Sequence, residues 1–207
     1  MQTRKGQSIE DASMAMIENE IGEHMYDKMQ WPIVRRVIHS TADFDFANKE
    51  AIIFGPNAIK GGIAALKRGC HIVTDVHGVS GLLCKTESAH FGNHIVCKIS
   101  EPDIAKAAKN AQTTKAQASM RACATELNDG IVAIGNAPTA LLELLQMIDE
   151  GICNPALIVG IPVGFISAVE SKTKLALTNL PYITNKGRKG GSPSAAAIVN
   201  ALYKLAH

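Results

Sequence analysis

The chain has 207 residues, of which 46% are hydrophobic and 19% are charged, and its formal net charge is +2 at pH 7. This composition is typical of a folded globular protein and excludes an intrinsically disordered chain. The small net charge, without a long basic block, argues against a general nucleic-acid-binding protein. No apolar run approaches the about 20 residues that span a membrane, and no signal-peptide core is present, so we expect a cytoplasmic protein without membrane contact.

The first elements predicted along the chain are two helices. Ser8 and Asp11 resemble a capping box at the start of the first helix. Its apolar residues follow helical spacing: Ile9, Ala12, Met16, Ile17 and Ile21. Pro32 suits the first turn of the second helix, because a proline at that position loses no helical hydrogen bond.

Short strands and helices then alternate to the end of the chain. The β-rich runs lie at residues 51–54, 71–75, 94–99, 131–135 and 156–161. Helix-like segments lie at residues 57–69, 103–128, 138–151 and 192–207. Apolar strands separated by helices predict the α/β class, with a mostly parallel sheet covered by helices on both faces. Because no repeat or linker divides the pattern, we expect a single domain over residues 1–207.

Two loops of the predicted sheet are suited to binding an anion. Ligands collect beyond the carboxyl ends of parallel strands, where helix N-termini offer free N–H groups and a positive dipole. Gly135 and Asn136 form the first such junction, ahead of a helix that Pro138 begins. Ser192 is expected to cap the last helix at the second junction. The second junction also carries cations and glycines: Lys186, Arg188, Lys189, Gly190 and Gly191. An ordinary glycine-rich loop with solvated cations is the alternative interpretation.

The segment WPIVRRVIHST, residues 31–41, has the pattern of an amphipathic helix. Its apolar side, which we expect to dock on the body of the protein, consists of Val34, Val37 and Ile38. The opposite side carries Arg36, His39 and Ser40. The helical pattern alone favours solvent on that side. The functional alternative is a ligand-facing surface, because arginine can bind a carboxylate in a bidentate manner and histidine can deliver a proton near neutral pH.

The remaining motifs point away from metals and nucleotides. His90, His94 and Cys97 have superficially ligand-like spacing, but residues three apart on a strand point to opposite faces, so we expect no metal site. His71 and His77 flank a strand end and are expected near the ligand side of the sheet. Neither a Walker loop nor a G-x-G-x-x-G fingerprint occurs, which argues against a nucleotide-dependent oxidoreductase, and no G-x-S-x-G elbow occurs, which argues against an α/β hydrolase.

Several of these segments together resemble the precorrin-8X methylmutase family and its anaerobic counterpart, cobalt-precorrin-8 methylmutase. The matching motifs are S-x-x-x-I-x-x-E (Ser13, Ile17, Glu20), R-x-x-H (Arg36, His39), VAIGNAPTAL (132–141), IPVGF-x-x-AxESK (161–172) and GRKGGSPxxAAxxNAL (187–202). The resemblance runs from about residue 8 to the C-terminus. It implies an isomerase of corrin (vitamin B12) biosynthesis that moves a methyl group from carbon 11 to carbon 12 of a tetrapyrrole, giving hydrogenobyrinate or its cobalt form, cobyrinate.

The resemblance also implies roles for individual residues. His39 matches the catalytic acid, Arg36 falls in the substrate site, and Ser13 matches a substrate-contacting serine. Lys115 stands where related sequences tend to carry an arginine, and it keeps the charge but loses the bidentate fork. Together with the anion-binding junctions, the expected substrate-binding residues are Ser13, Arg36, Lys115, Asn136, Arg188, Gly190, Gly191 and Ser192.

The family further implies a homodimer with the substrate held near the subunit interface. The reaction needs a positioned acid and a shaped pocket, so we expect no cofactor and no dedicated metal site. The expected substrate is a tetrapyrrole with or without cobalt, because no residue is identified that would contact the metal. A corrinoid-binding carrier without catalysis is the alternative function, because a product-binding pocket needs the same anion-binding residues.

Overall fold

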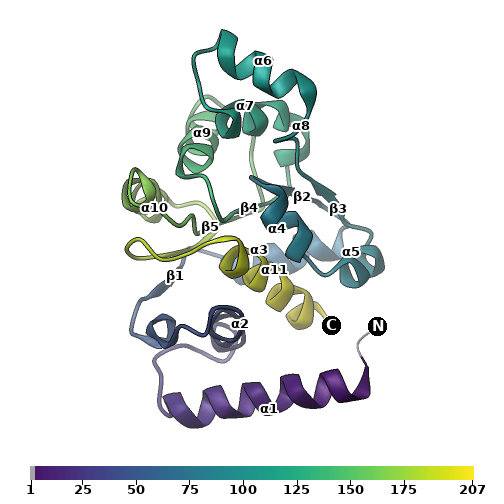
Figure 1. Ribbon diagram of the computed structural model, residues 1–207, viewed down its shortest axis with the longest axis vertical. Helices are drawn as coiled ribbons and strands as arrows, with labels where there is room; N and C mark the ends of the chain where they lie inside the picture. The colour runs from purple at the N-terminus through teal and green to yellow at the C-terminus, as the bar shows by residue number, and fades with distance from the viewer. Residues whose placement is uncertain (1–2) are drawn as a thin grey trace.

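The computed structural model describes residues 3–207, and its strands form one six-stranded sheet in the order β1-β6-β5-β4-β2-β3 (Figure 1). The strands are β1 (Ile52–Phe54), β2 (His71–Thr74), β3 (His94–Val96), β4 (Ile131–Ile134), β5 (Leu157–Gly160) and β6 (Tyr182–Asn185). All neighbouring strands run parallel except β1, which pairs antiparallel with β6 at one edge. The predicted α/β class with a mostly parallel sheet is confirmed.

Helices cover both faces of the sheet, because successive strand residues point to opposite sides. In β4, Ile131 and Ala133 join one buried cluster, while Val132 and Ile134 join the other. The first cluster contains residues of α1 (Arg4–Ile21), α2 (Trp31–Thr41), α3 (Ala58–Lys67), α4 (His77–Leu82) and α11 (Ser192–Ala206). The second contains residues of α7 (Lys115–Ala122), α8 (Ala124–Leu127), α9 (Pro138–Asp149) and α10 (Ala168–Ala176). The remaining helices are η1 (Phe44–Ala47), α5 (Lys85–Phe91) and α6 (Pro102–Asn110).

The first helix begins earlier than predicted. α1 is capped by Thr3, whose side chain accepts a hydrogen bond from Gly6 N at 3.1 Å, so Ser8 is a residue of the helix and not its cap. Of the apolar residues that follow helical spacing, Ile17 alone is buried in the helix, and Ile9 and Met16 are exposed. The apolar spacing correctly predicts a helix here, but much of its apolar side does not face the core of the protomer.

The predicted helix over residues 103–128 is divided into α6, α7 and α8. Gln112 has a positive φ of 53° between α6 and α7, which interrupts the helical backbone. Thr114 then starts α7 with a true capping box, because its side chain accepts from Gln117 N while the Gln117 side chain accepts from Thr114 N. The β-rich run at 94–99 is also shorter than predicted and ends at Val96. Strand β6 and helices α4, α5 and α10 lie outside the predicted elements.

The carboxyl ends of the parallel strands bring several loops together. The loops after β4, β5 and β6 are linked by backbone hydrogen bonds, such as Val163 N to Gly135 O at 3.2 Å and Gly191 N to Ile161 O at 3.0 Å. The last of these loops leads into α11, which crosses the middle of the fold (Figure 1). Among the described residues, no helix is both long and apolar enough to cross a membrane.

Candidate active site

The last turn of α2 lies beside the first turn of α11, at the carboxyl edge of the sheet. The apolar side of α2 packs as predicted, since Val34, Val37 and Ile38 have no exposed surface. The Ser40 hydroxyl donates a hydrogen bond to the Val37 carbonyl oxygen at 2.9 Å within α2, and it also lies 3.4 Å from the Pro193 carbonyl oxygen of α11. This contact places the half-buried His39, one residue earlier on α2, close to the start of α11.

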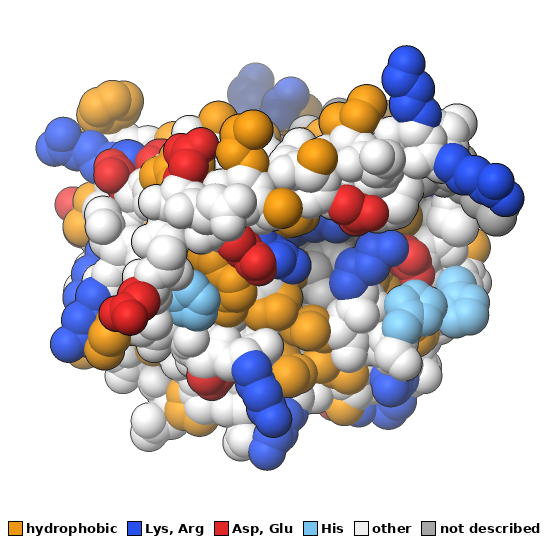
Figure 2. All heavy atoms as spheres, turned by 90° about the horizontal axis from the view of Figure 1, so that it is seen from below, with side chains coloured by type: hydrophobic (Ala, Val, Ile, Leu, Met, Phe, Trp, Pro, Cys, Tyr) orange, Lys and Arg blue, Asp and Glu red, His pale blue; other side chains and the backbone are white. Residues whose placement is uncertain are grey.

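The polar side of α2 is partly covered by α1. Arg36 Nη2 lies 2.7 Å from Glu10 Oε1, and both side chains are only 20% exposed. Arg36 and Glu10 also line a 440 Å³ groove between α1, α2 and α11. Figure 2, which looks onto α1, shows acidic and basic side chains side by side in this hollow. The solvent interpretation of this side is therefore wrong at Arg36, which is held in an ion pair.

Ser13 lies on the same side of α1 as Glu10, because residues three apart on a helix are neighbours on its surface. Its hydroxyl donates a hydrogen bond to the Ile9 carbonyl one turn earlier, at 2.8 Å. The side chain is half-buried. A hydroxyl that donates in this way still has lone pairs that can accept a hydrogen bond.

The loop between β6 and α11 depends on two consecutive glycines. Gly190 and Gly191 have φ values of 145° and 121°. A Cβ atom on Gly190 would lie 2.2 Å from the Ile161 carbonyl oxygen, so no other residue fits this position without moving the backbone. Gly191 is the N-cap of α11, which makes Ser192 the first helical residue and corrects its predicted role as the cap.

The start of α11 keeps unpaired polar groups. Within residues 3–207, no acceptor is assigned to the backbone N–H groups of Ser192 and Ser194, and Pro193 has none to offer. The hydroxyl oxygen of the fully buried Ser194 also has no hydrogen-bond partner there. Open N–H groups at the positive end of a helix dipole form a seat for a carboxylate.

The cations of this loop divide into two kinds. Lys189 Nζ lies 2.7 Å from Asp43 and 2.5 Å from Asp45, and these carboxylates raise the pKa of Lys189. Lys186 pairs with Glu50 at 2.6 Å. Arg188 has no carboxylate partner within the described chain, and its guanidinium lies 5.5 Å from the centre of the Phe165 ring. Of the predicted cationic cluster, therefore, Arg188 is the member left for a ligand.

The loop after β4 already holds an anion from the protein itself. The carboxylate of the buried Asp75 accepts hydrogen bonds from Gly135 N at 3.1 Å, Asn136 N at 2.8 Å and Ala137 N at 2.7 Å. Burial raises the pKa of Asp75, and the three N–H groups oppose that shift. The backbone of this junction is consequently closed to a substrate anion, contrary to the sequence prediction, although the Asn136 side chain is exposed.

Lys115 is brought to the same edge by a contact between two helix starts. It is the first residue of α7, and Thr114 just before it shares a 3.1 Å hydrogen bond with Thr139 in the first turn of α9. Thr139 follows Asn136 by three residues. The exposed Lys115 therefore lies near the loop after β4.

The other histidines are spread over the molecule. His71 begins β2 at the amino edge of the sheet, so its predicted place on the ligand side is wrong. His77 does lie after the carboxyl end of β2, where its Nε2 is 3.0 Å from Ser100 Oγ. His90 neighbours His207, and His94 neighbours His71. Over residues 3–207, no group of three or more His, Cys, Asp or Glu side chains is placed to hold a metal ion.

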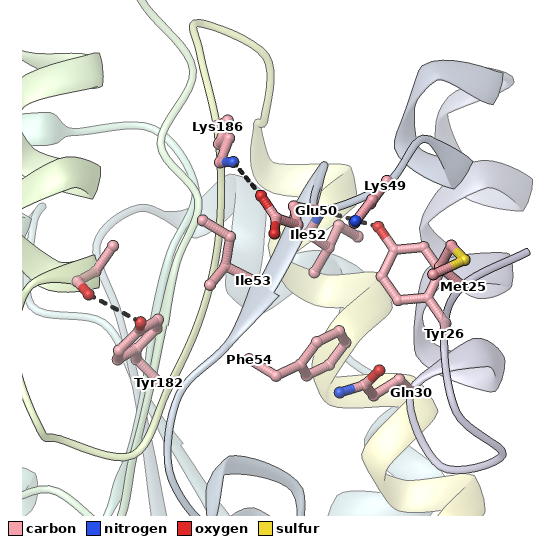
Figure 3. Close-up of a pocket in the computed structure, with 11 residues that line it drawn as sticks. Met25, Tyr26, Gln30, Lys49, Glu50, Ile52, Ile53, Phe54, Tyr182 and Lys186 are labelled. Atoms are coloured by element: carbon pink, nitrogen blue, oxygen red, sulfur yellow. Dashed lines mark hydrogen bonds and ion pairs between the residues drawn. The ribbon is translucent and has the colours of Figure 1, made fainter.

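A 470 Å³ cavity lies elsewhere, against the edge strand β1 (Figure 3). Tyr26 and Phe54 meet edge to face on one side of it, with ring centroids 6.3 Å apart. The Lys186–Glu50 ion pair lies at its rim. None of the predicted catalytic or substrate-binding residues lines this cavity, so its size does not make it the candidate active site.

The family profile described as "Precorrin-8X methylmutase" matches residues 8–205 of the chain. The chain belongs to the precorrin-8X methylmutase family. It is therefore an intramolecular methyl-transferring isomerase of cobalamin biosynthesis. The matched range extends from α1 through α11 and so includes every residue of the candidate active site.

Relatives of this methylmutase are named either for cobalt-precorrin-8 or for precorrin-8X. The chain is 46% identical to the cobalt-precorrin-8 methylmutase of Priestia megaterium, covering 99% of this chain and 90% of the relative. It is 37% identical to the precorrin-8X methylmutase of Pseudomonas aeruginosa, covering 96% and 95%. A crystal structure of precorrin-8X methylmutase from Thermus thermophilus matches with a TM-score of 0.89 and 36% identity, covering 97% and 96%.

Sequence reasoning missed two buried residues that hold the loops of the candidate active site. Asp75 ends the run HIVTD, and a carboxylate after a buried strand is a signal that could have been used. Lys172 lies within the family motif IPVGF-x-x-AxESK, but nothing in the local sequence indicates that this lysine is buried.

Proposed function

We propose that this methylmutase moves the methyl group from carbon 11 to carbon 12 of precorrin-8X or cobalt-precorrin-8, with His39 as the catalytic acid. The products are hydrogenobyrinate and cobyrinate, respectively. The observation that carries the proposal is the position of His39 beside the open N-terminus of α11, through the contact of Ser40 with Pro193. A side chain that can donate a proton thus lies near a seat for a substrate carboxylate.

In this mechanism His39 donates a proton to the ring system, which allows the methyl group to migrate within the same molecule. The reaction is an isomerisation, so the ring loses a proton once the methyl group has moved and His39 is reprotonated before the next turnover. The protein supplies a positioned acid and a pocket that favours one isomer. We expect these requirements to be met without a resident cofactor or metal.

The peripheral carboxylates of the substrate are bound by the groups left open at the carboxyl edge. Arg188 can bind one carboxylate, and the open N–H groups at the start of α11, beginning with Ser192, can bind another. Gly190 and Gly191 would let the backbone come close to that carboxylate, although the Gly191 N–H itself is already bonded to the Ile161 carbonyl. Lys115 adds a positive charge at the neighbouring loop.

Three further contacts complete the proposed substrate site. Asn136 and Ser13 would donate or accept hydrogen bonds through side chains that are exposed and half-buried, respectively. Arg36 would share its guanidinium between Glu10 and the substrate, since five N–H donors can serve two carboxylates.

The deciding experiment compares His39→Ala with the wild-type protein and with His71→Ala. The His71 variant is the matched control because that histidine lies at the opposite edge of the sheet. Conversion of precorrin-8X and of cobalt-precorrin-8 is followed by absorption spectroscopy, and binding of the product by titration. We expect His39→Ala to lose turnover while product binding is retained. Unchanged turnover would refute the catalytic role, and a wild-type protein that binds the tetrapyrrole without converting it would be a carrier.

We further propose that residues 1–207 form one methylmutase domain, that the protein is cytoplasmic, and that it works as a homodimer with the substrate near the subunit interface. Large apolar side chains that are exposed on the protomer support the dimer. Phe165 and Ile166, beside Arg188, are 82% and 87% exposed, and α1 exposes Ile9 and Met16 to 60% and 62%. Apolar surface of this kind is common where another chain packs. Sedimentation velocity at micromolar concentration distinguishes a dimer from a monomer.

A further inference from the structure

A buried lysine holds the loop between β6 and α11. Lys172 lies on α10, and only 2% of the residue is exposed. Its Nζ donates hydrogen bonds to Asn185 Oδ1 at 3.1 Å and to the Lys189 carbonyl oxygen at 2.8 Å. No carboxylate pairs with this ammonium group within the described chain. The charge of Lys172 is thus satisfied only by neutral oxygens.

Asn185 extends this contact to the other end of the same turn. It is the last residue of β6 and is also 2% exposed. Its Nδ2 donates to the Lys186 carbonyl at 3.0 Å and to the Lys189 carbonyl at 2.8 Å. The Lys189 carbonyl therefore accepts from both Lys172 and Asn185, and the turn from 186 to 189 is closed by buried side chains.

This turn sets the geometry of the residues that follow it. Gly190 comes directly after Lys189 and has no room for a side chain against the Ile161 carbonyl. Gly191 N then bonds that same Ile161 carbonyl at 3.0 Å and starts α11. The Arg188 carbonyl, inside the turn, accepts a hydrogen bond from Gly164 N at 3.2 Å. Moving the Lys189 carbonyl would displace Arg188 and the first turn of α11 together.

Lysine at this buried position lowers the stability of the folded protein. Burying an ammonium group without a carboxylate partner is unfavourable, and burial lowers the pKa of Lys172 to about 8. Lys172 also lines a 310 Å³ cavity whose lining includes the apolar Ile53 and Val169, so an unbranched apolar side chain could be accommodated there. A side chain kept at a cost to stability is expected where it serves the active site.

We propose that Lys172 is a positioning residue for substrate binding. Through Asn185 and the Lys189 carbonyl, it holds the turn so that Arg188 and the open N–H groups of α11 face the same carboxylate-bearing edge of the tetrapyrrole. The inference rests on the proposed function, because it assigns those groups to the substrate. Lys172 itself does not touch the substrate.

The test compares Lys172→Met with Lys174→Met, which removes an exposed lysine from the same helix. We expect Lys172→Met to raise KM by about tenfold or more, equivalent to losing about one hydrogen bond to a charged group. We expect kcat to change by less than about threefold, because the buried Val34, Val37 and Ile38 hold α2, and with it His39, in place. Lys174→Met should leave both constants unchanged.

A second variant, Asn185→Leu, breaks the same contact from its other side. If both residues act through the Lys189 carbonyl, the KM of the double variant will be close to that of either single variant. The inference would be overturned if the fold-increase in KM of the double variant equalled the product of the two single increases. It would also be overturned if the KM of Lys172→Met equalled that of Lys174→Met. If Lys172→Met does not fold, Asn185→Leu alone decides, and an unchanged KM rejects the positioning role. Failure of the proposed function is distinct, because the wild-type protein would then convert neither tetrapyrrole.

Discussion

Replacing Lys172 with methionine should change how the stability of the protein depends on pH. Burial lowers the pKa of this lysine from its ordinary value of 10.5 to about 8. A shift of one pKa unit corresponds to about 1.4 kcal/mol. The buried charge therefore costs the folded state about 3 kcal/mol.

The sign of the effect follows from where the proton is bound. Below about pH 8 Lys172 is protonated in both the folded and the unfolded state, so the full cost is present. Between about 8 and 10.5 the unfolded chain keeps the proton and the folded protein has released it. Because the unfolded state then binds more protons, the stability of the wild-type protein rises with pH relative to the methionine variant.

The assay is urea denaturation of both proteins at several pH values from 7 to 10.5. We expect the wild-type protein to gain about 3 kcal/mol over Lys172→Met across this range, and the variant to be at least as stable at pH 7. Taking the difference cancels other groups that titrate in alkali, such as Cys70, whose pKa burial raises to about 11. A difference in unfolding free energy that stays constant with pH would refute the reasoning. So would a Lys174→Met variant that loses stability relative to the wild-type protein with rising pH as Lys172→Met does.

Two further substitutions test the loops of the candidate active site. Asp75→Ala leaves one buried and two part-buried N–H groups without an acceptor and should lower the free energy of unfolding by about 3 kcal/mol. Urea denaturation beside the exposed Asp149→Ala checks this, and equal stabilities would contradict it. Gly190→Ala places a Cβ atom against the Ile161 carbonyl and should cost about 2–4 kcal/mol. The control Gly187→Ala has open space at φ 77° and should cost only about 1–2 kcal/mol in the same thermal melts.

The fold is largely predictable from the sequence because its signals are local. The helix that carries His39 is predicted correctly, since its apolar residues repeat at the helical period and Pro32 marks its start. Strand β6 is missed because its sequence YITN, residues 182–185, ends in polar side chains. Thr184 and Asn185 are nevertheless buried, through hydrogen bonds to Gly160 O and to the following turn, and no local pattern predicts those partners.

The candidate active site is less predictable, because its chemistry depends on contacts between distant residues. The sequence predicts that Gly190 and Gly191 let the backbone come close to a ligand, but it does not show that Gly190 lies against the Ile161 carbonyl. It cannot show that Asp43, Asp45 and Glu50 neutralise two of the three cations of that loop. The pairing of Arg36 with Glu10, 26 residues earlier, is hidden in the same way.

Asp75 has a consequence for the free energy of binding. Its carboxylate orders the loop after β4 during folding, whether or not a tetrapyrrole is bound. The conformational entropy of that loop is therefore lost once, when the chain folds, and is not subtracted from the affinity for the substrate. The neighbouring side chain of Asn136 is thus presented on a preorganised backbone, and in the proposed substrate site the macrocycle would meet a loop that does not have to rearrange.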